Sequence, residues 1–406
     1  MRNMKNPSSP SRRSFLQLSA AAAAAATVGY RIVTEPMLAA AQTRARIHAE
    51  PTDGVMINAN ENPLGPCEAA RSAVAQIAAK GGRYCDWLTD DLIKTFAESQ
   101  GLKPEYIRAY PGSSEPLHYT VSAFTSPSKS YVTADPGYEA GMYAAKFSGA
   151  RIVKVPLTKT YAHDVKAMLA AAPDAGVFYI CTPNNPSGTL TSHSDIEFAL
   201  ANKPKDSVLL VDEAYIHFTT APSVIDLVKA DKDLIVLRTF SKIYGMAGLR
   251  CGFAIARPDL LEKIAAHGGW NAMPITALAA ATTSLKEPQL IAERKRINTG
   301  IREATFEWLD KNRYSYVRSE ANFFQLDAKR PAKQVIDAMA QQNIFIGRAW
   351  PVWPTHVRIT VGTQPEMERF QAAFLRVMNG SAMSYSIPAP RPRRTSLDGL
   401  RVPLDT

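Results

Sequence analysis

The chain has few residues arranged to bind a metal ion. Its 406 residues include seven histidines and four cysteines, which are Cys67, Cys85, Cys181 and Cys251. No two cysteines form a C-x-x-C pair, and the histidines show no H-E-x-x-H or comparable ligand spacing. Closely spaced cysteine and histidine ligands are the usual sequence signature of zinc sites. We therefore expect no metal site.

The body of the chain also lacks internal repeats and long hydrophobic runs. The one extended apolar stretch, from Phe15 to Tyr30, is shorter than the roughly 20 residues that a membrane-spanning helix needs. Apolar residues make up 46% of the chain and charged residues 21%, which is typical of globular proteins and excludes a disordered or fibrous chain. The length predicts one large domain or two cooperating domains. Because the apolar stretch is too short to span a bilayer, we expect no stable membrane association.

Most of the excess positive charge lies at the two ends of the chain. The sequence carries 47 Lys and Arg against 37 Asp and Glu, a formal charge of +10. Residues 1–41 hold a net +4 and residues 381–406 a net +2, so the body keeps only +4. The body has no basic stripe interleaved with aromatic residues, and nucleic-acid binding is therefore not expected.

The N-terminus has the features of an export signal. Residues 11–17 read SRRSFLQ, an alanine-rich stretch follows, and 36–41 read PMLAAA, a small-residue cleavage pattern. Adjacent arginines followed by Phe-Leu resemble a twin-arginine signal. We expect a signal peptide at 1–41, cut at Ala41–Gln42, and passage through the twin-arginine export machinery to the bacterial periplasm. Because that route carries folded proteins, the cysteines are expected to be free and mostly buried.

Apolar, partly β-branched segments alternate with helical patterns along the body. Strands are expected at 176–183, 207–218, 234–240 and 251–256, with a helix at 192–201. Continuously apolar strands suit a sheet that is covered on both faces. The alternation predicts an α/β fold with a mainly parallel sheet.

A long helical pattern at 285–312 predicts a connection into a smaller α+β domain. That domain is expected to hold an extended segment at 314–327, a strand at 357–360 and helices at 332–342 and 365–378. The proline-rich end predicts a poorly ordered tail. The expected division is a signal peptide at 1–41, an N-terminal arm at 42–75, a large domain at 76–284, a small domain at 285–380 and the tail at 381–406.

Four short polar segments lie at the C-terminal ends of the expected strands, where open α/β sheets bind ligands. Read alone, a carboxylate, a lysine and an arginine at strand ends can be a structural ion-pair network. The same groups also suit a cofactor. A lysine can form a Schiff base, an aspartate can hold a ring nitrogen protonated, and hydroxyls with an arginine can bind phosphate. The segments are Asn184-Asn-Pro-Ser-Gly188, Asp212-Glu-Ala-Tyr215, Thr239-Phe-Ser-Lys242 and Gly248-Leu-Arg-Cys-Gly252.

With these segments, the chain resembles fold-type I pyridoxal-phosphate enzymes, and among them the class I/II aminotransferases of the histidinol-phosphate aminotransferase group. The resemblance extends from about Asn58 to Met378. It implies pyridoxal 5'-phosphate as the cofactor, bound by the large domain, whose mainly parallel sheet is sandwiched by helices. Further markers are Asn58-Ala-Asn-Glu-Asn-Pro-Leu-Gly-Pro66, Arg83-Tyr84, Gly112-Ser-Ser-Glu115, Pro136-Gly-Tyr138, Ala321-Asn-Phe323 and Val357-Arg-Ile-Thr-Val-Gly362.

The resemblance implies a role for each residue around the cofactor ring. Lys242 carries the internal aldimine and then moves the proton from the substrate. Asp212 pairs with the pyridine nitrogen, so that the ring accepts charge from the carbanion. Asn185 and Tyr215 bind the ring hydroxyl oxygen. Tyr138 stacks on the ring, although a core aromatic is the alternative.

The phosphate group is implied to lie at a helix start. The backbone N–H groups of Ser113 and Ser114 and the helix dipole suit an anion, and Thr239, Ser241 and Arg250 are implied to complete this site.

Tyr84 is implied to reach the phosphate bound by the neighbouring subunit, which predicts a homodimer. The family usually has proline after this tyrosine, whereas this chain has Cys85.

Three residues match the substrate side of the family's site. Arg358 matches the arginine that binds the substrate α-carboxylate through a bidentate pair, and Asn322 is implied to support it. Arg348 aligns with the arginine that histidinol-phosphate enzymes use near the distal phosphate. Trp350 and Trp353 follow closely. They either pack the domain interface or line a pocket for an aromatic or bulky apolar side chain.

The resemblance implies an aminotransferase that moves an amino group between an L-amino acid and a 2-oxo acid by a ping-pong mechanism. Export argues against histidinol phosphate, because it is a biosynthetic intermediate of the cytoplasm. It favours instead an amino acid, for example an aromatic one, or a specialised precursor of the peptide wall or of a secondary metabolite. A decarboxylase, β-lyase or cyclising enzyme is the alternative on the same fold, and Lys242 together with Arg358 favours transamination. A non-catalytic binding protein is disfavoured because Lys242 and Asp212 are both present.

Overall fold

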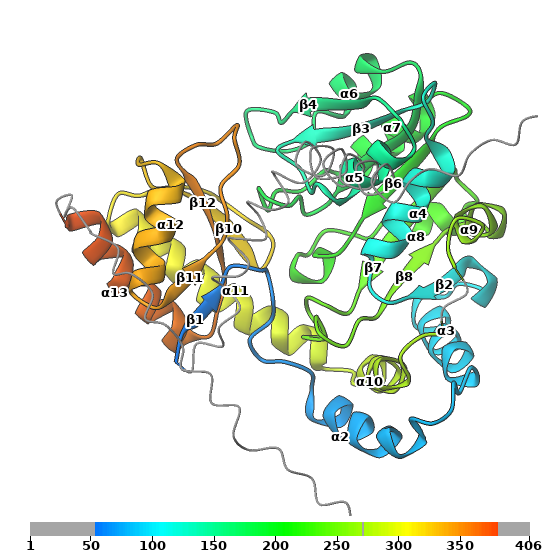
Figure 1. Cartoon of the computed structure of the whole chain (residues 1–406), viewed down its shortest axis with the longest axis horizontal. Helices are drawn as coiled ribbons and strands as arrows, with labels where there is room; N and C mark the ends of the chain where they lie inside the picture. Colours follow the sequence, from blue (N-terminus) through cyan, green and yellow to red (C-terminus); the bar gives the residue numbers. More distant parts are fainter. Residues whose placement is uncertain (1–52, 270–271, 381–406) are drawn as a thin grey trace, which may run out of the picture.

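A computed structural model of the chain describes residues 53–269 and 272–380. The expected signal peptide at 1–41 and the expected tail at 381–406 lie outside the described residues. The described chain forms a larger and a smaller unit, and helix α11 (Leu290–Lys311) runs between them (Figure 1). Each unit has its own cluster of buried hydrophobic side chains. These two cores agree with a two-domain division, whose boundaries stay a prediction.

The larger unit is built on a seven-stranded sheet with strand order β2-β8-β7-β6-β5-β3-β4. Strand β8 pairs antiparallel with both β2 and β7, and the other pairs are parallel. Each of the four segments expected to be strands contains one, which confirms a mainly parallel α/β sheet. The strand expected at 207–218 is too long, because it ends at Asp212 and the chain then turns into a 3-10 turn at Ile216–Phe218. The strands are β2 (Ile107–Tyr110), β3 (Ser130–Asp135), β4 (Ile152–Pro156), β5 (Ala175–Cys181), β6 (Val208–Asp212), β7 (Leu234–Thr239) and β8 (Gly252–Ile255).

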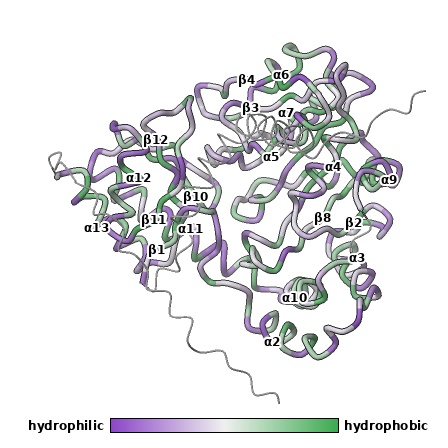
Figure 2. Tube along the Cα trace, in the orientation of Figure 1, coloured by the Kyte–Doolittle hydropathy of each residue, from purple (hydrophilic) through white to green (hydrophobic). Residues whose placement is uncertain are grey.

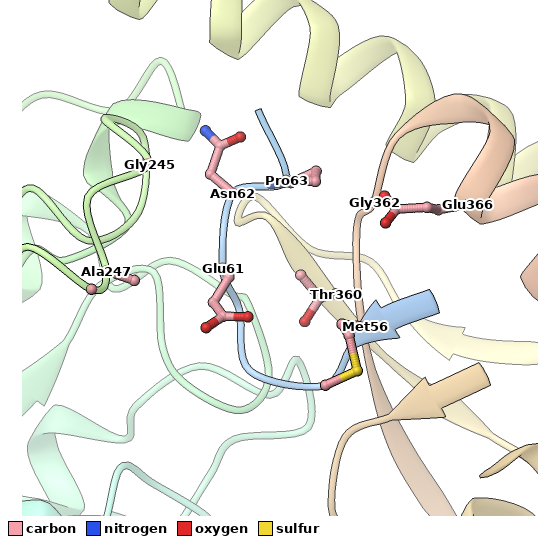
Figure 3. Close-up of a pocket in the computed structure, with 10 residues that line it drawn as sticks. Met56, Glu61, Asn62, Pro63, Gly245, Ala247, Thr360, Gly362 and Glu366 are labelled. Carbon is pink, nitrogen blue, oxygen red and sulfur yellow. The ribbon is translucent and has the colours of Figure 1, made fainter. Parts of the chain in front are cut away.

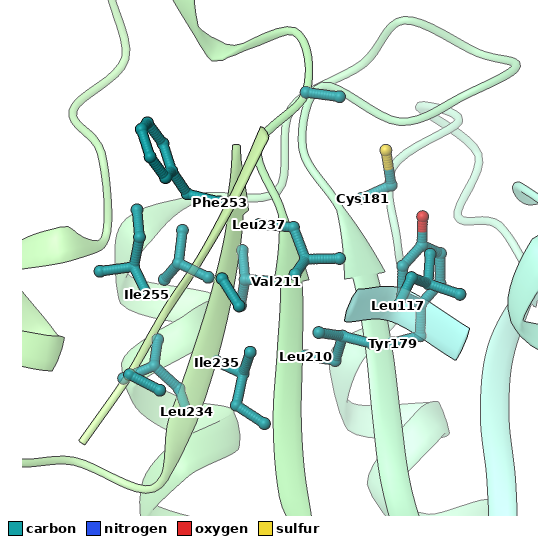
Figure 4. Packing of buried hydrophobic residues seen from close by; sticks show 14 of the residues in the cluster. Leu117, Tyr179, Cys181, Leu210, Val211, Leu234, Ile235, Leu237, Phe253 and Ile255 are labelled. Atoms are coloured by element: carbon teal, nitrogen blue, oxygen red, sulfur yellow. The ribbon is translucent and has the colours of Figure 1, made fainter. Parts of the chain in front are cut away.

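The central strands β5, β6, β7 and β8 are buried along their whole length. Their side chains pack with those of Leu117 and other helical residues (Figure 4), and hydrophobic positions follow these strands through the molecule (Figure 2). Burying apolar area of this kind contributes roughly 25 cal/mol per Å². The continuous apolar runs seen in the sequence therefore reflect strands covered on both faces.

Helices surround this sheet, and two of them, α6 and α7, begin with a side-chain cap. Ser192 accepts a hydrogen bond from the Asp195 amide at the start of α7, and Asp164 accepts one from the Ala167 amide at α6. The helices of this unit are α2 (Glu68–Ile77), α3 (Trp87–Gln100), α4 (Ser114–Phe124), α5 (Ala140–Phe147), α6 (Val165–Ala171), α7 (His193–Asn202), α8 (Ile225–Lys229), α9 (Pro258–Ala265) and α10 (Ile275–Leu285), with short 3-10 turns η1 (Ala78–Lys80), η2 (Pro104–Tyr106) and η3 (Ile216–Phe218).

The smaller unit combines two short sheets with helices. The antiparallel sheet has strand order β12-β10-β9, and the second sheet pairs β1 in parallel with β11. The segment expected to be extended at 314–327 therefore consists of two antiparallel strands. The elements are β1 (Val55–Ile57), β9 (Ser315–Val317), β10 (Phe323–Asp327), α12 (Ala332–Gln341), β11 (Ile344–Ile346), β12 (His356–Thr360) and α13 (Gln364–Asn379).

The N-terminal arm connects the two units. Its strand β1 completes the small sheet beside β11, whereas α2, which follows it, packs on α10 of the larger unit. The arm thereby places the residues between β1 and α2 across the junction of the units (Figure 1).

Helix α13 begins with a capping box, in which the Thr363 side chain binds the Glu366 amide and the Glu366 carboxylate binds the Thr363 amide.

All four cysteines are free thiols, with Cys85, Cys181 and Cys251 buried and Cys67 half-buried. Within residues 53–269 and 272–380, no helix combines the length and the apolar character that crossing a bilayer requires.

Candidate active site

The expected chemistry-bearing residues meet at the C-terminal ends of β5, β6 and β7. Cys181 at the end of β5 lies opposite Asp212 at the end of β6, and Asp212 lies opposite Leu237 of β7. Lys242 is the third residue after β7. The parallel register therefore brings segments from three crossover connections to one edge of the sheet.

Asp212 is a buried carboxylate with defined partners. Its side chain is 3% exposed, its Oδ2 accepts a hydrogen bond from the Tyr179 hydroxyl at 2.9 Å, and its Oδ1 accepts one from the Ala214 amide at 3.1 Å. Burial raises the pKa of Asp212 to about 6, against the two hydrogen bonds and the charge of Lys242, which lower it. A cationic group placed against this buried carboxylate would stabilise its charged form.

Lys242 lies close to this carboxylate and to an aromatic ring. Its Nζ donates to the Ala59 carbonyl oxygen at 3.5 Å and lies 5.6 Å from the centroid of the Tyr215 ring. Burial, followed by the charge of Arg358, lowers the pKa of Lys242 to about 8, while Glu61 and Asp212 act in the opposite direction. The lowered pKa increases the fraction of neutral amine at pH 7, which is the nucleophilic form.

Tyr215 and Asn185 are held by hydrogen bonds that orient their remaining polar atoms. Asn60 Nδ2 donates to the Tyr215 hydroxyl at 3.1 Å, so the proton of that hydroxyl remains to be donated. Arg358 Nη1 donates to Asn185 Oδ1 at 2.7 Å, which leaves the Asn185 amide nitrogen as a donor. Two neutral donors are thus available beside Lys242.

Arg358 is almost fully buried and only partly satisfied. Its side chain donates to Asn185 and, through Nη2, to the Asn58 carbonyl oxygen at 2.9 Å, while its Nε is buried with no partner among the described residues. Burial lowers the pKa of Arg358 to about 10, so it stays cationic at neutral pH. Asn322 Nδ2 donates to the carbonyl oxygens of Asn60 and Glu61 at 3.2 Å each, and so fixes the arm beside this arginine.

A cluster of donors lies at the start of α4. Ser113 is the N-cap residue and Ser114 the first residue of the helix, whose free N–H groups attract an anion. Arg250 Nη1 donates to the Ser241 hydroxyl at 3.4 Å, and the Thr239 and Ser241 hydroxyls are 2.9 Å apart. All five residues expected at a phosphate are therefore brought to one place.

Gly112 makes this cluster possible. Its φ is +91°, and a Cβ placed on it would lie 2.2 Å from Arg250 Nη2. We expect Gly112→Ala to lower cofactor affinity at least about tenfold, because the backbone becomes strained by about 1–2 kcal/mol and the guanidinium must leave the helix start. Equilibrium dialysis against pyridoxal phosphate measures this.

Gly300→Ala is the matched control, since a Cβ there meets nothing within 4 Å and the residue lies inside α11. It should keep wild-type affinity and gain up to about 1 kcal/mol of stability. An unchanged affinity in Gly112→Ala would contradict the assignment of an anion to this cluster.

The two remaining cofactor residues differ in exposure. Tyr138 is half-buried, and burial raises the pKa of its hydroxyl. Tyr84 lies before α3 with 69% of its surface exposed in this single chain. The next residue, Cys85, has a φ of +53°, a conformation that the proline usual in the family cannot adopt. The loop after Tyr84 therefore has its own backbone path here.

Arg348 and the tryptophans lie on the small-unit side of this site. Arg348 forms an ion pair with Glu139, and its guanidinium lies 4.8 Å from the Trp350 ring centroid. The Arg358 guanidinium lies 5.4 Å from the same ring. Trp353 instead packs edge-on against Tyr161 at 5.6 Å. Trp350 therefore belongs to the site, whereas Trp353 packs beside it.

Three residues that hold this site have no role that their sequence motifs predict. Asn58 and Asn60 bind Arg358 and Tyr215, and their signal was the Asn58–Pro66 marker in which they lie. Glu139, the partner of Arg348, had no signal, because nothing local to Pro136-Gly-Tyr138 indicates an ion pair with a residue 209 positions away.

A cavity of about 310 Å³ lies beside the site, between the arm and the loop after Lys242. Glu61 and Asn62, which lie in the irregular segment of the arm after β1, line one side of this space. Thr360, Gly362 and Glu366 line it on the small-unit side (Figure 3). None of the expected cofactor or substrate residues lines it. We therefore place the candidate site at the Lys242 and Asp212 cluster.

The residues present fit pyridoxal phosphate by their donor chemistry. A buried carboxylate, a lysine with a lowered pKa and two neutral donors suit the ring, and the helix start with Arg250 suits the phosphate. No group of three or more metal-ligating side chains occurs in the described part of the chain.

Comparison with known proteins gives the same result. The model of the family "aminotransferase class I and II" matches residues 52–374, and that of the twin-arginine translocation signal matches residues 9–29. A histidinol-phosphate aminotransferase of Moorella thermoacetica is 30% identical over 80% of this chain and 86% of its own. An aromatic amino acid aminotransferase of Rhodococcus jostii is 32% identical over 78% and 88%. The structure of histidinol-phosphate aminotransferase from Sinorhizobium meliloti with pyridoxal-5'-phosphate is similar with a TM-score of 0.75 and 26% identity, over 83% of this chain and 94% of that one.

Fold and site together define a fold-type I pyridoxal-phosphate enzyme. The chain belongs to the aminotransferase class I and II family, and it is a pyridoxal-phosphate-dependent aminotransferase whose substrates are amino acids and 2-oxo acids. Its twin-arginine signal sequence marks it for export.

Proposed function

We propose that this aminotransferase acts on an L-amino acid with an aromatic or bulky side chain and passes the amino group to a 2-oxo acid. The observation that carries the proposal is the position of Arg358, buried against Asn185 and Trp350 and close enough to Lys242 to lower its pKa. A substrate carboxylate bound there would hold the amino acid beside the lysine, with the Trp350 ring next to its side chain. The relative named for aromatic amino acids supports this substrate range.

Each residue has a defined task in this proposal. When bound, pyridoxal phosphate supplies an electron sink for the negative charge that develops at the substrate Cα. Asp212 would hold the ring nitrogen protonated, and Asn185 and Tyr215 would donate to the ring hydroxyl oxygen. Lys242 Nζ would take the proton from the Cα of the amino donor in the first half-reaction and would give a proton to the Cα of the new amino acid in the second. Tyr138 would cover the ring. The phosphate would be held by Ser113, Ser114, Thr239, Ser241 and Arg250.

A donor and acceptor panel tests this function. Mature holoenzyme is incubated with single L-amino acids and with pyruvate, 2-oxoglutarate or phenylpyruvate, and the new amino acid is measured. We expect amino transfer that requires the 2-oxo acid and is fastest with aromatic donors. Product formation without any 2-oxo acid would favour a decarboxylase or lyase on this fold, and fastest transfer from histidinol phosphate would contradict the substrate proposed here.

Arg358→Lys should lower kcat/KM for the amino acid by about ten- to a hundredfold. Lysine keeps the charge but loses the planar fork, and one charge-assisted hydrogen bond is worth about 1.5–3 kcal/mol. Stopped-flow kinetics of the first half-reaction gives the value. An amine without a carboxylate should react equally with both enzymes, and an equal loss for that amine would show that Arg358 acts on the fold rather than on the substrate.

We also propose that the protein is a homodimer in the periplasm. The exposed Tyr84 in a cofactor-binding family supports the dimer, and the export signal supports the location. Sedimentation of the mature protein at the mass of one chain would exclude the dimer. Recovery of the enzyme in the cytoplasmic fraction of a cell with an active twin-arginine pathway would exclude the location.

A further inference from the structure

One tryptophan lies against both guanidinium groups of the substrate side. The guanidinium carbons of Arg348 and Arg358 lie 4.8 and 5.4 Å from the centroid of the Trp350 ring. Trp350 is 4% exposed, and its indole N–H has no partner among the described residues. A buried donor without a partner is costly, so a hydrogen-bond acceptor that reached this N–H would be stabilised by it. The substrate side therefore has a cationic and aromatic wall.

Only one of the two arginines has a carboxylate partner. Arg358 donates to the amide oxygen of Asn185 and a carbonyl oxygen, both neutral. Arg348 is paired with Glu139, which follows Tyr138 in the larger unit, and this ion pair joins the two units across the site. Glu139 is the more buried of the two partners, with 28% of its side chain exposed against 51% for Arg348. The wall thus holds one uncompensated positive charge.

We propose that Glu139 determines side-chain specificity by neutralising Arg348, so that the enzyme prefers substrates with uncharged side chains over acidic or phosphorylated ones. Arg358 alone remains to bind one anion, the α-carboxylate. A second anion on the substrate would have to displace Glu139 from Arg348 and would then lie beside its carboxylate. Like charges at close range disfavour that complex. Since both half-reactions share one pocket, the preference applies to the 2-oxo acid as well.

This inference rests on the proposed function and predicts a gain of activity. Glu139→Gln removes the competing carboxylate and leaves Arg348 cationic. The ratio of kcat/KM for glutamate to kcat/KM for phenylalanine, measured on the mature holoenzyme, should rise at least about tenfold, as expected for one charge-assisted hydrogen bond. In the double variant Glu139→Gln, Arg348→Ala the gain should disappear, because the cation that causes it is gone.

Asp174→Asn is the matched control. Asp174 forms an Arg–carboxylate pair of similar exposure with Arg151, at 2.6 Å, and it precedes β5 at the opposite end of the sheet. Its substrate ratio should equal that of the wild type. A ratio that rises equally in the control would show a general effect of surface charge and would overturn the proposal.

Binding of unreactive ligands separates this inference from the proposed function. Calorimetry with glutarate and pentanoate, which differ by one carboxylate, gives the same comparison without catalysis, and Glu139→Gln should favour glutarate by at least about tenfold. If the wild type transfers amino groups but neither ratio changes in Glu139→Gln, the specificity role is wrong and the function stands. If no donor reacts while the glutarate preference still appears, the function fails and the charge role of Glu139 is retained.

Discussion

Lys242→Ala is expected to remove the visible absorption band of the bound cofactor and to lower kcat by at least about 10⁴-fold. Nucleophilic residues that act as one unit with their partners typically show losses of this size. The alanine has no amine to form the bond with the cofactor. The amine that it removes is the one whose Nζ lies beside Tyr215 and whose charge lowers the pKa of Asp212. Absorption spectra of dialysed protein and steady-state rates measure the two effects. A retained band would contradict the assignment of Lys242.

Lys203→Ala is the control for removing a buried lysine. The Lys203 side chain is 4% exposed, its Nζ donates to the Ser207 carbonyl oxygen at 2.7 Å, and burial lowers its pKa as it does for Lys242. It lies at the opposite end of the sheet, before β6. We expect its band and kcat to match those of the wild type. A similar loss of both in this variant would mean that packing, rather than the Lys242 amine, determines activity.

Glu213→Ala is expected to lower the free energy of unfolding by about 3–5 kcal/mol, the cost of removing one partner of a buried ion pair. Glu213 is fully buried and accepts hydrogen bonds from Arg238 Nε, the Ser223 hydroxyl and the Val224 amide, each at 2.8 Å. Arg238 also donates to His217 Nε2 at 2.9 Å, and burial keeps the pKa of that imidazole well below its usual value, so it accepts as a neutral base. Without Glu213, the buried guanidinium has no anion.

Urea unfolding of the holoenzyme measures this loss. Glu68→Ala removes one partner of an exposed pair with Arg71 and should cost less than about 1 kcal/mol. Replacing both buried partners, as Glu213→Leu with Arg238→Met, should recover most of the stability, because a hydrophobic pair needs no charge compensation. Equal stabilities of Glu213→Ala and Glu68→Ala would contradict the view that this pair fixes the strand ends carrying Asp212 and Lys242.

Local patterns predicted β5 to β8 of the large sheet and the helices of the smaller unit, whereas β2, β3, β4 and every helix of the larger unit except α7 were not predicted. The helix expected at 192–201 is α7 (His193–Asn202), and the last helix expected at 365–378 is α13 (Gln364–Asn379). Both begin at a residue whose side chain caps the helix, a signal contained in a few neighbouring residues. The extended segment at 314–327 contains the two strands β9 and β10. Their antiparallel pairing depends on a reversal of the chain that the apolar pattern does not indicate.

The sequence by itself determined the fold class, the family and the cofactor, since buried strands and the motifs after them are contiguous in the chain. Tertiary structure alone decided how the substrate side is assembled. The contacts of Arg358 join residues 173 and 300 positions apart, and the pair of Arg348 with Glu139 joins residues 209 apart. Such contacts depend on how the arm, the sheet and the small unit pack together. For this reason only the tertiary structure shows that Arg348 is paired with a carboxylate, whereas Arg358 has neutral partners and can bind the carboxylate of a substrate.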